Sequence, residues 1–443
     1  MSLVENKQRV VFTKEMKKDY TILIPTMLPM HFELIAKIID SYGYKTQVLN
    51  NSGNKVKECG LKYVHNDSCY PAILVIGQFI DALESGEYDP HKTALMITQT
   101  GGGCRASNYI ALLRKALERA GFGYVPVISL NFAGLESNPG FTVPLSMAHR
   151  MFYAVNYGDL LMLLLNQCKP YEITKGESEK LAHEWVAKLA KEMETSSRII
   201  DYKKVKENYA KIIADFARIP RRKEQKVKVG IVGEIFVKFS PLGNNNLEDF
   251  LISEGAETVM PGLLDFCLYC VYNGIVDEQL YGTGKLKALG SKVLFKGLIK
   301  KQHDIIDAIN LEGSFEPPAS FSKTCTLTKG YMGLGAKMGE GWLLTAEMLE
   351  LIEQGTTNIV CAQPFGCLPN HIVGKGVMKL IKEKNPDVNI VAIDYDPGAT
   401  QINQENRIKL MLANAKQPVA PQQGEQKIEK EQESEKELAT QAV

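Results

Sequence analysis

The sequence predicts an α/β protein with two lobes, each built around a parallel β-sheet. Short apolar runs alternate with helical patterns, the alternation stops over residues 144–220, and a similar alternation resumes at residue 227. Apolar runs of about four to eight residues between helices are typical of strands that are buried on both faces of a parallel sheet. The interruption indicates that a helical segment joins the two lobes.

The elements follow in order along the chain. The first lobe, residues 1–150, has predicted strands at 21–25 (TILIP), 45–49, 94–99 (ALMITQ) and 125–130, with a helix over 106–120. Residues 151–226 are predicted as the helical connecting segment. The second lobe, residues 227–416, has strands at 227–235, 359–362 and 389–394, with a helix over 370–384. Residues 417–443 contain no aromatic residue and are rich in Gln, Glu and Lys, so this tail is predicted to be disordered.

Both lobes contain a strand, a turn with a cysteine, a helix and a second strand. The first copy begins ALMITQTGGGC and the second NIVCAQPFGC, which places Cys104 and Cys367 at equivalent turns. We therefore predict two Rossmann-like lobes of similar topology. Ligands of such sheets bind at the carboxyl ends of the strands, where both turns lie. The predicted site is the cleft between the lobes.

Composition excludes several classes of protein. The chain has 443 residues, with 52 Lys and Arg against 51 Asp and Glu, so no nucleic-acid partner is expected. Its most apolar run, residues 160–165, is far shorter than the about 20 residues of a membrane span. The first residues contain no apolar signal region, which predicts a cytoplasmic protein. Nine cysteines in a reducing compartment are expected to be thiols or metal ligands.

Three cysteines share one context, because Cys69, Cys104 and Cys367 are each predicted to begin a helix. The free N–H groups and the dipole at a helix N-terminus favour a thiolate, so we expect a lowered thiol pKa. His371 follows Cys367 by about one helical turn and is a candidate to orient a bound group or to donate a proton. A histidine with a purely structural role is the alternative.

Glycines flank two of these cysteines. Gly102 and Gly103 precede Cys104, and Gly366 precedes Cys367. Residues without a side chain let the backbone approach a bulky inorganic group closely. A phosphate held by a glycine-rich turn is the alternative, but one such turn is a weak signal.

The ligand types predict the kind of metal. Thiolates favour zinc or iron–sulfur clusters, and structural zinc sites use closely spaced pairs of ligands. The three dispersed cysteines therefore favour a cluster in the interlobe cleft. The fourth ligand stays open: Cys59 is the first choice, Cys361 is the second, and an iron left open to water or substrate is the third. The pair Cys267 and Cys270 lies in an apolar run and is predicted to belong to the core.

Several motifs resemble a known family. NDSCYPAILVIGQ, TQTGGGCRASNY, VGIVGEIFVKFSPLGNNN, GEGWLLTAEM and CAQPFGCLPNHIVGKG resemble the iron–sulfur region of acyl-CoA dehydratase activase-related proteins. This group belongs to the wider family of 2-hydroxyacyl-CoA dehydratase components and double-cubane cluster proteins, and the resemblance covers residues 20–414. It implies an oxygen-sensitive [4Fe-4S] or double-cubane [8Fe-9S] cluster. Cys69, Cys104 and Cys367 match the cysteine motifs, and Cys59 matches them less well.

The resemblance also implies a partner and a reaction. An ATPase with the actin-like fold supplies low-potential electrons in this family, and it would be a separate chain here because no GxxxxGK[ST] motif or preceding ATPase domain is present. The expected function is electron transfer, in an anaerobic setting, to an acyl-CoA or another small molecule that is hard to reduce. The chain would act as a reductase or an (R)-2-hydroxyacyl-CoA dehydratase-like component. The sequence leaves its oligomeric state open, and a homo-oligomer is one option.

Two other classes of function are alternatives to iron–sulfur electron transfer. One is a non-redox module of two lobes that binds a nucleotide or CoA, with its cysteines in the core. The other is a zinc hydrolase, which ranks last because the sequence contains no HExxH motif.

Overall fold

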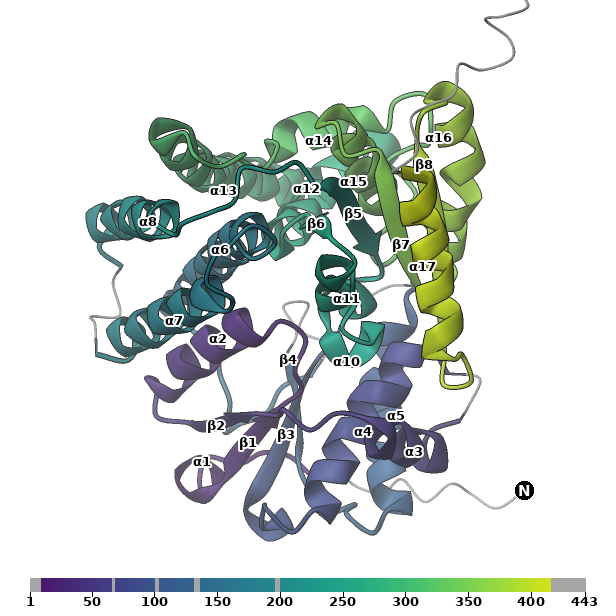
Figure 1. Ribbon diagram of the computed structural model, residues 1–443. Coiled ribbons are helices and arrows are strands. Elements are labelled where there is room, and N and C mark those ends of the chain that lie inside the picture. The colour runs from purple at the N-terminus through teal and green to yellow at the C-terminus, as the bar shows by residue number, and fades with distance from the viewer. Residues whose placement is uncertain (1–8, 66–67, 100–102, 131–135, 196–199, 416–443) are drawn as a thin grey trace, which may run out of the picture.

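The computed structural model describes residues 9–65, 68–99, 103–130, 136–195 and 200–415. Gly102 and the predicted disordered tail, residues 417–443, lie outside the described residues. Figure 1 shows the first lobe in purple and blue below the second lobe in green and yellow, with three teal helices along one side. The predicted α/β fold with two lobes is confirmed.

The first lobe contains a sheet of four parallel strands in the order β2-β1-β3-β4. The strands are β1 (Thr21–Ile24), β2 (Lys45–Val48), β3 (Thr93–Thr98) and β4 (Val127–Leu130). The helices are α1 (Met16–Asp19), α2 (Pro29–Asp40), α3 (Asn54–Tyr63), α4 (Tyr70–Glu84) and α5 (Tyr109–Arg119). Every residue of α4 from Tyr70 to Leu83 is buried, because this helix lies between the sheet and its neighbouring helices.

The second lobe has the equivalent order β6-β5-β7-β8, again fully parallel. Its strands are β5 (Val227–Gly233), β6 (Ala256–Val259), β7 (Asn358–Pro364) and β8 (Asn389–Tyr395). Its helices are α9 (Ile235–Phe239), α10 (Pro241–Asn244), α11 (Leu247–Ser253), α12 (Leu263–Tyr281), α13 (Lys285–Glu312), α14 (Phe321–Leu327), α15 (Trp342–Glu353), α16 (Met378–Lys384) and α17 (Gln401–Ala415). Four helices, α12 to α15, lie between β6 and β7, where the predicted simple alternation of strand and helix leaves no room for so many.

Three helices connect the lobes, as the loss of strand patterns predicts. They are α6 (Leu145–Cys168), α7 (Glu177–Thr195) and α8 (Tyr202–Ala217). Their apolar faces share one buried cluster with α2 and the first sheet. The connecting segment therefore packs as part of the first lobe rather than as a free linker.

A buried histidine and an aspartate connect the three helices α2, α6 and α12. His31 of α2 is fully buried, and its Nε2 lies 2.8 Å from Oδ1 of Asp159 in α6. Asp159 also accepts hydrogen bonds from the N–H groups of Leu263 and Leu264, at 2.9 and 2.7 Å, and so caps the N-terminus of α12. A Cβ atom on Gly158 would lie 2.3 Å from the His31 ring, so this close approach requires glycine. The contact orients α12 relative to the first lobe.

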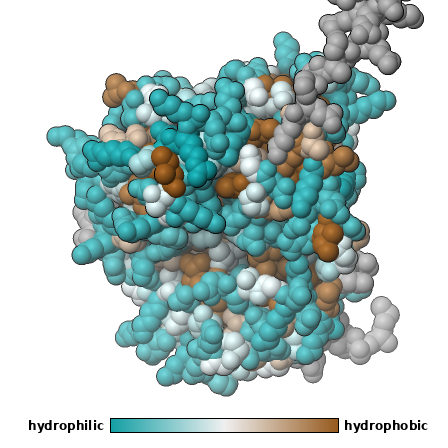
Figure 2. All heavy atoms as spheres, in the orientation of Figure 1, coloured by the Kyte–Doolittle hydropathy of each residue, from teal (hydrophilic) through white to brown (hydrophobic). Residues whose placement is uncertain are grey.

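The face of the molecule in Figure 2 is mostly hydrophilic, with apolar side chains in small groups. Among the described residues, no helix combines the length and the apolar character that crossing a membrane requires.

Candidate metal centre

The structure brings Cys69, Cys104 and Cys367 to the boundary between the lobes. Cys104 follows β3 and Cys367 follows β7, at equivalent strand ends, while Cys69 directly precedes α4. The N–H of Tyr70 in the first lobe donates a hydrogen bond of 3.1 Å to the carbonyl of Phe365 in the second. The start of α4 therefore lies against the turn that carries Cys367.

Two glycines of the second lobe lie against cysteines of the first. A Cβ atom on Gly366 would lie 3.2 Å from the Cα of Cys69, and one on Gly339 would lie 3.8 Å from the Sγ of Cys104. Both glycines have positive φ angles, 76° and 61°. Any other residue at Gly366 would therefore meet both strain and a crowded neighbour. These glycines keep open the space around the thiols.

The three cysteines lie at the beginnings of helical turns, in agreement with the expected local geometry. Cys69 is the N-cap of α4, Cys104 is the N-cap of a 3₁₀ turn, and the carbonyl of Cys367 accepts the N–H of His371 at 3.2 Å. Backbone N–H groups two or three residues later also reach the sulfur atoms. These donors belong to Ala72, Ala106 and Asn370 respectively.

The expectation of lowered thiol pKa values is wrong for the protein without metal. Burial is the largest effect at all three cysteines and outweighs the backbone N–H groups. It raises the pKa of Cys69, raises that of Cys104 to about 11, and raises that of Cys367 much further. The helix N-termini lower these pKa values but do not compensate for the lost hydration. A bound metal would have to displace the protons.

Tyr109 and two glutamates belong to the same site, and the sequence did not single them out. The hydroxyl of Tyr109 lies 2.8 Å from the Sγ of Cys69. Glu234 follows β5, and its carboxylate accepts the N–H of Val237 at 2.9 Å. Glu340 accepts the N–H of Ile235 at 2.8 Å. The sequence signals were weak: Glu234 ends a predicted strand in VGIVGE, and Glu340 lies between two glycines in GEGW.

The negative charges of the two glutamates affect the pKa values of neighbouring groups in the site. Burial, followed by the negative charge of Glu340, raises the pKa of Glu234 to about 8. Both carboxyl groups also contribute to the raised pKa values of Cys104 and Cys367. Glu234 is therefore mostly protonated at neutral pH, and this limits the negative charge beside the thiols.

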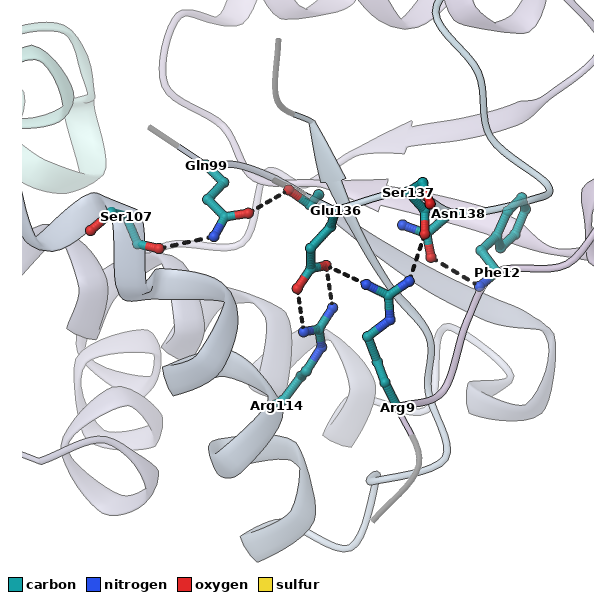
Figure 3. Close-up of polar contacts among 9 residues, drawn as sticks. Arg9, Phe12, Gln99, Ser107, Arg114, Glu136, Ser137 and Asn138 are labelled. Carbon is teal, nitrogen blue, oxygen red and sulfur yellow. Dashed lines mark hydrogen bonds and ion pairs between the residues drawn. The ribbon is translucent and has the colours of Figure 1, made fainter. Parts of the chain in front are cut away.

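A polar network anchors the turn of Cys104 to the first sheet (Figure 3). The side chain of Gln99, just after β3, donates to the carbonyl of Ser107 at 3.0 Å and accepts from Ser129 of β4 at 2.8 Å. The hydroxyl of Ser107 in turn donates to the carbonyl of Cys104 at 2.7 Å. Cys104 is thus held in place by β3 and by its neighbour β4 at the edge of the sheet.

A second part of this network holds the segment after β4. Arg114 of α5 forms two hydrogen bonds of 2.7 Å with the carboxylate of Glu136, and Arg9 lies 3.0 Å from the same group (Figure 3). The hydrogen bonds from Arg114 lower the pKa of Glu136. A bidentate pair of this kind has a fixed geometry. It fixes α5, which begins at Tyr109, relative to the sheet.

Cys59 and Cys361, the candidates for a fourth ligand, do not join the three cysteines. Cys59 lies in α3, where its Sγ is 3.8 Å from the carboxylate of Glu84. The next residue, Gly60, packs against Ile73 and Gly77 of α4, and the Cys59 side chain is directed toward the end of that helix at Glu84. Cys361 is fully buried within β7, with its Sγ 3.7 Å from Asn370. This placement favours neither residue as a ligand.

The remaining predicted residues lie near the site. The N–H of Gly103 donates to the sulfur of Met338 at 3.2 Å, which joins the two lobes again. His371 is exposed, and its Nδ1 lies 2.7 Å from the carbonyl of Cys367. The ring therefore braces the turn of Cys367, in keeping with a structural role.

The prediction that Cys267 and Cys270 belong to the core is wrong. Cys267 is half-buried and Cys270 is exposed. The run LLDFCLYCVY is apolar on every side of the helix, so its periodicity does not reveal which face is exposed. The structure places α12 at the boundary of the lobes, where one of its faces stays open.

The three thiols are soft donors of the kind that zinc and iron–sulfur clusters share. Within the described ranges, no three His, Cys, Asp or Glu side chains are close enough together to hold one ion. The thiols of a cubane each bind a different iron and therefore stand further apart than the ligands of one ion. Three thiols, backbone N–H donors and glycines beside them are compatible with such a cluster, which in most proteins has four cysteine ligands.

A separate cavity of about 460 Å³ lies between α2, β2 and the start of α10. It is at the carboxyl ends of β1 and β2, a common ligand position in this fold. The Oγ1 of Thr26 and the Oδ1 of Asn51 are both buried without a hydrogen-bond partner. Both residues line the cavity together with Gln78, Asn50 and Ser240. Its walls carry hydroxyl and amide groups together with the charged side chains of Glu33, Lys37 and Asp40, so they suit a polar ligand.

No protein-family model matches this chain, and no curated protein matches it. The fold and the grouping of the three cysteines are observations of the structure. The family resemblance rests on the motifs alone and stays a prediction.

Proposed function

We propose that this chain is an iron–sulfur protein that accepts low-potential electrons from a separate ATP-dependent activase with the actin-like fold. It passes them to an acyl-CoA or another small molecule that is hard to reduce, as a reductase or dehydratase-like component in the cytoplasm. The observation that carries the proposal is the meeting of Cys69, Cys104 and Cys367 from two lobes at one boundary. A [4Fe-4S] or [8Fe-9S] cluster would supply one-electron transfer there.

The cysteines of the chain hold the metal, and its hydrogen-bond donors tune the site. The N–H groups beside the three thiols and the hydroxyl of Tyr109 direct positive dipoles at the sulfur atoms. Such donors stabilise negative charge on sulfur and therefore favour the reduced state. Glu234 keeps its proton to a pH of about 8, so it adds little negative charge that would oppose reduction.

Anaerobic purification tests the proposal. The expected result is a brown protein with stoichiometric iron and acid-labile sulfide, whose visible absorption bleaches in air. Reconstitution that yields zinc in stoichiometric amount and no iron would contradict it.

The cavity favours a second candidate function, a module that binds a nucleotide or CoA without redox chemistry. Its volume lies within the range of small-molecule sites, and Thr26 and Asn51 offer unpaired polar atoms. Calorimetry with adenosine and with coenzyme A on the metal-free chain tests this function. Binding that Asn51→Ala abolishes and Cys104→Ser leaves unchanged would support it, and no binding of either probe would contradict it.

A further inference from the structure

One face of α12 lies against the loop that lines the cysteine site. The indole N–H of Trp342 donates to Asn273 at 3.0 Å, and Lys337 forms an ion pair with Asp277. Asn273 and Asp277 are four residues apart on the helix and share this face. The loop of residues 337–342 therefore runs along α12.

Cys270 lies on the same face of the helix. It precedes Asn273 by three residues and Asp277 by seven, the spacing of side chains stacked on one side. Its neighbour Tyr269 also contacts the loop, since the phenol donates to the carbonyl of Lys337 at 2.8 Å. Cys270 therefore lies on the face of α12 that packs on this loop.

The other side of this loop meets the predicted ligands. Met338 accepts the N–H of Gly103, next to Cys104, at 3.2 Å. A Cβ atom on Gly339 would lie 3.8 Å from the Sγ of Cys104 and 3.2 Å from Pro369, two residues after Cys367. The loop is the shared neighbour of Cys104, Cys367 and α12.

The charge on the loop acts on the same thiols. Burial, followed by Glu340, raises the pKa of Cys270 to about 12, and Glu340 also contributes to the raised pKa values of Cys104 and Cys367. Cys270 is nevertheless exposed, so its thiol is accessible from outside the core.

We propose that Cys270 of α12 is a fourth thiolate ligand of the interlobe cluster, in addition to Cys69, Cys104 and Cys367. The inference rests on the proposed function and replaces Cys59 and Cys361 as candidates. Binding forms one bond between iron and Sγ and releases the thiol proton to water. Iron and sulfur keep their oxidation states in this step, so it needs no oxidant or reductant.

Anaerobic reconstitution of the full chain with ferrous iron and sulfide tests this ligand. The variants are Cys270→Ser, Cys104→Ser and, as a matched control, Cys325→Ser in the buried part of α14. Measured values are iron and sulfide per chain and the electron paramagnetic resonance spectrum of the reduced protein. Cys270→Ser is expected to retain sulfide but to lose one iron in four, about three irons for four sulfides. Cys325→Ser is expected to match the wild type.

The outcomes distinguish a failure of the fourth ligand from a failure of the proposed iron–sulfur function. Wild-type iron and an unchanged spectrum in Cys270→Ser, with loss of iron in Cys104→Ser, would overturn the fourth ligand alone. Full iron in Cys104→Ser would overturn the proposed function itself.

Alkylation provides a readout that does not depend on a folded variant. In the wild-type chain, N-ethylmaleimide is expected to modify Cys270 without metal and to spare it once the cluster is loaded. Mass spectrometry that finds equal modification of Cys270 in both forms would contradict the proposal.

Discussion

The sulfur of Cys69 and the hydroxyl oxygen of Tyr109 lie 2.8 Å apart, although each belongs to the start of a different helix. Cys69 is the N-cap of α4, and Tyr109 is the first residue of α5. The polar network of Figure 3 holds α5 against the sheet, so the phenol approaches the thiol from a fixed position. This contact brings together two of the three cysteine-bearing segments.

Tyr109→Phe removes the hydroxyl and keeps the ring. The metal-free protein is expected to lose about 0.5–1.5 kcal/mol of unfolding free energy, the usual contribution of one hydrogen bond. In the loaded protein, iron per chain should stay constant while the reduction potential becomes more negative, because a donor to sulfur is lost. Chemical denaturation and anaerobic voltammetry measure these effects. An unchanged potential would show that Tyr109 does not contact the cluster.

Gly366→Ala is expected to lower the iron content. The φ of +76° strains an alanine by about 1–2 kcal/mol, and its Cβ would also crowd Cys69 at 3.2 Å. Gly355→Ala is the matched control, since Gly355 has a φ of +81° but no atom within 4 Å of the added Cβ. Both variants should lose stability through the strain, Gly366→Ala more than Gly355→Ala because of the crowding, and Gly366→Ala alone should lose iron. Equal iron in the two variants would contradict the role of Gly366.

Glu350→Gln is expected to change the pH dependence of stability. Burial raises the pKa of Glu350 to about 7, above its ordinary value of 4.5. The folded state therefore holds a proton that the unfolded chain releases between these pH values. The stability that Glu350 contributes is complete below pH 4.5 and is lost as the pH rises to 7.

Glutamine has no proton to release, and it can still accept the hydrogen bond of 2.7 Å from Thr324. Relative to Glu350→Gln, the wild type should therefore lose roughly 2–3 kcal/mol between pH 4.5 and 7. Urea denaturation of both proteins at several pH values measures this difference. A constant difference across the range would be inconsistent with the raised pKa.

The purified chain alone is expected not to hydrolyse ATP, because its sequence contains no phosphate-binding GxxxxGK[ST] loop. The measurement is phosphate release by the pure protein under anaerobic conditions. Turnover that a substitution within this chain abolishes would contradict the expectation and would remove the need for a separate ATPase.

The strands and the two cysteine turns were predictable because they depend on local sequence. Apolar runs at strand length located seven of the eight strands closely or in part, and the matching turns correctly placed Cys104 and Cys367 after β3 and β7. The repeat also appears in an element that was not recognised from sequence. Cys69 begins α4 before β3, and Gly341 begins α15 before β7 at the equivalent point of the second lobe.

The features of the site that the sequence does not predict depend on contacts between segments that are far apart in the chain. The proximity of Glu340 to Cys270 arises only when the loop before α15 packs on α12. The raised thiol pKa values arise from burial between lobes, which a helix N-terminus in the sequence does not reveal. The direction of the Cys59 side chain, toward Glu84, follows from the packing of α3 across α4.

The central claim is tested most directly by measuring iron and acid-labile sulfide per chain after anaerobic reconstitution. The proteins compared are the wild type, Cys69→Ser, Cys104→Ser, Cys367→Ser and Cys361→Ala. The account predicts a loaded wild type, loss of iron in each of the three serine variants with the fold retained, and full iron in Cys361→Ala. That control changes a fully buried thiol and should cost only about 1 kcal/mol of stability. Full iron in the three serine variants, or its loss only in Cys361→Ala, would contradict the account.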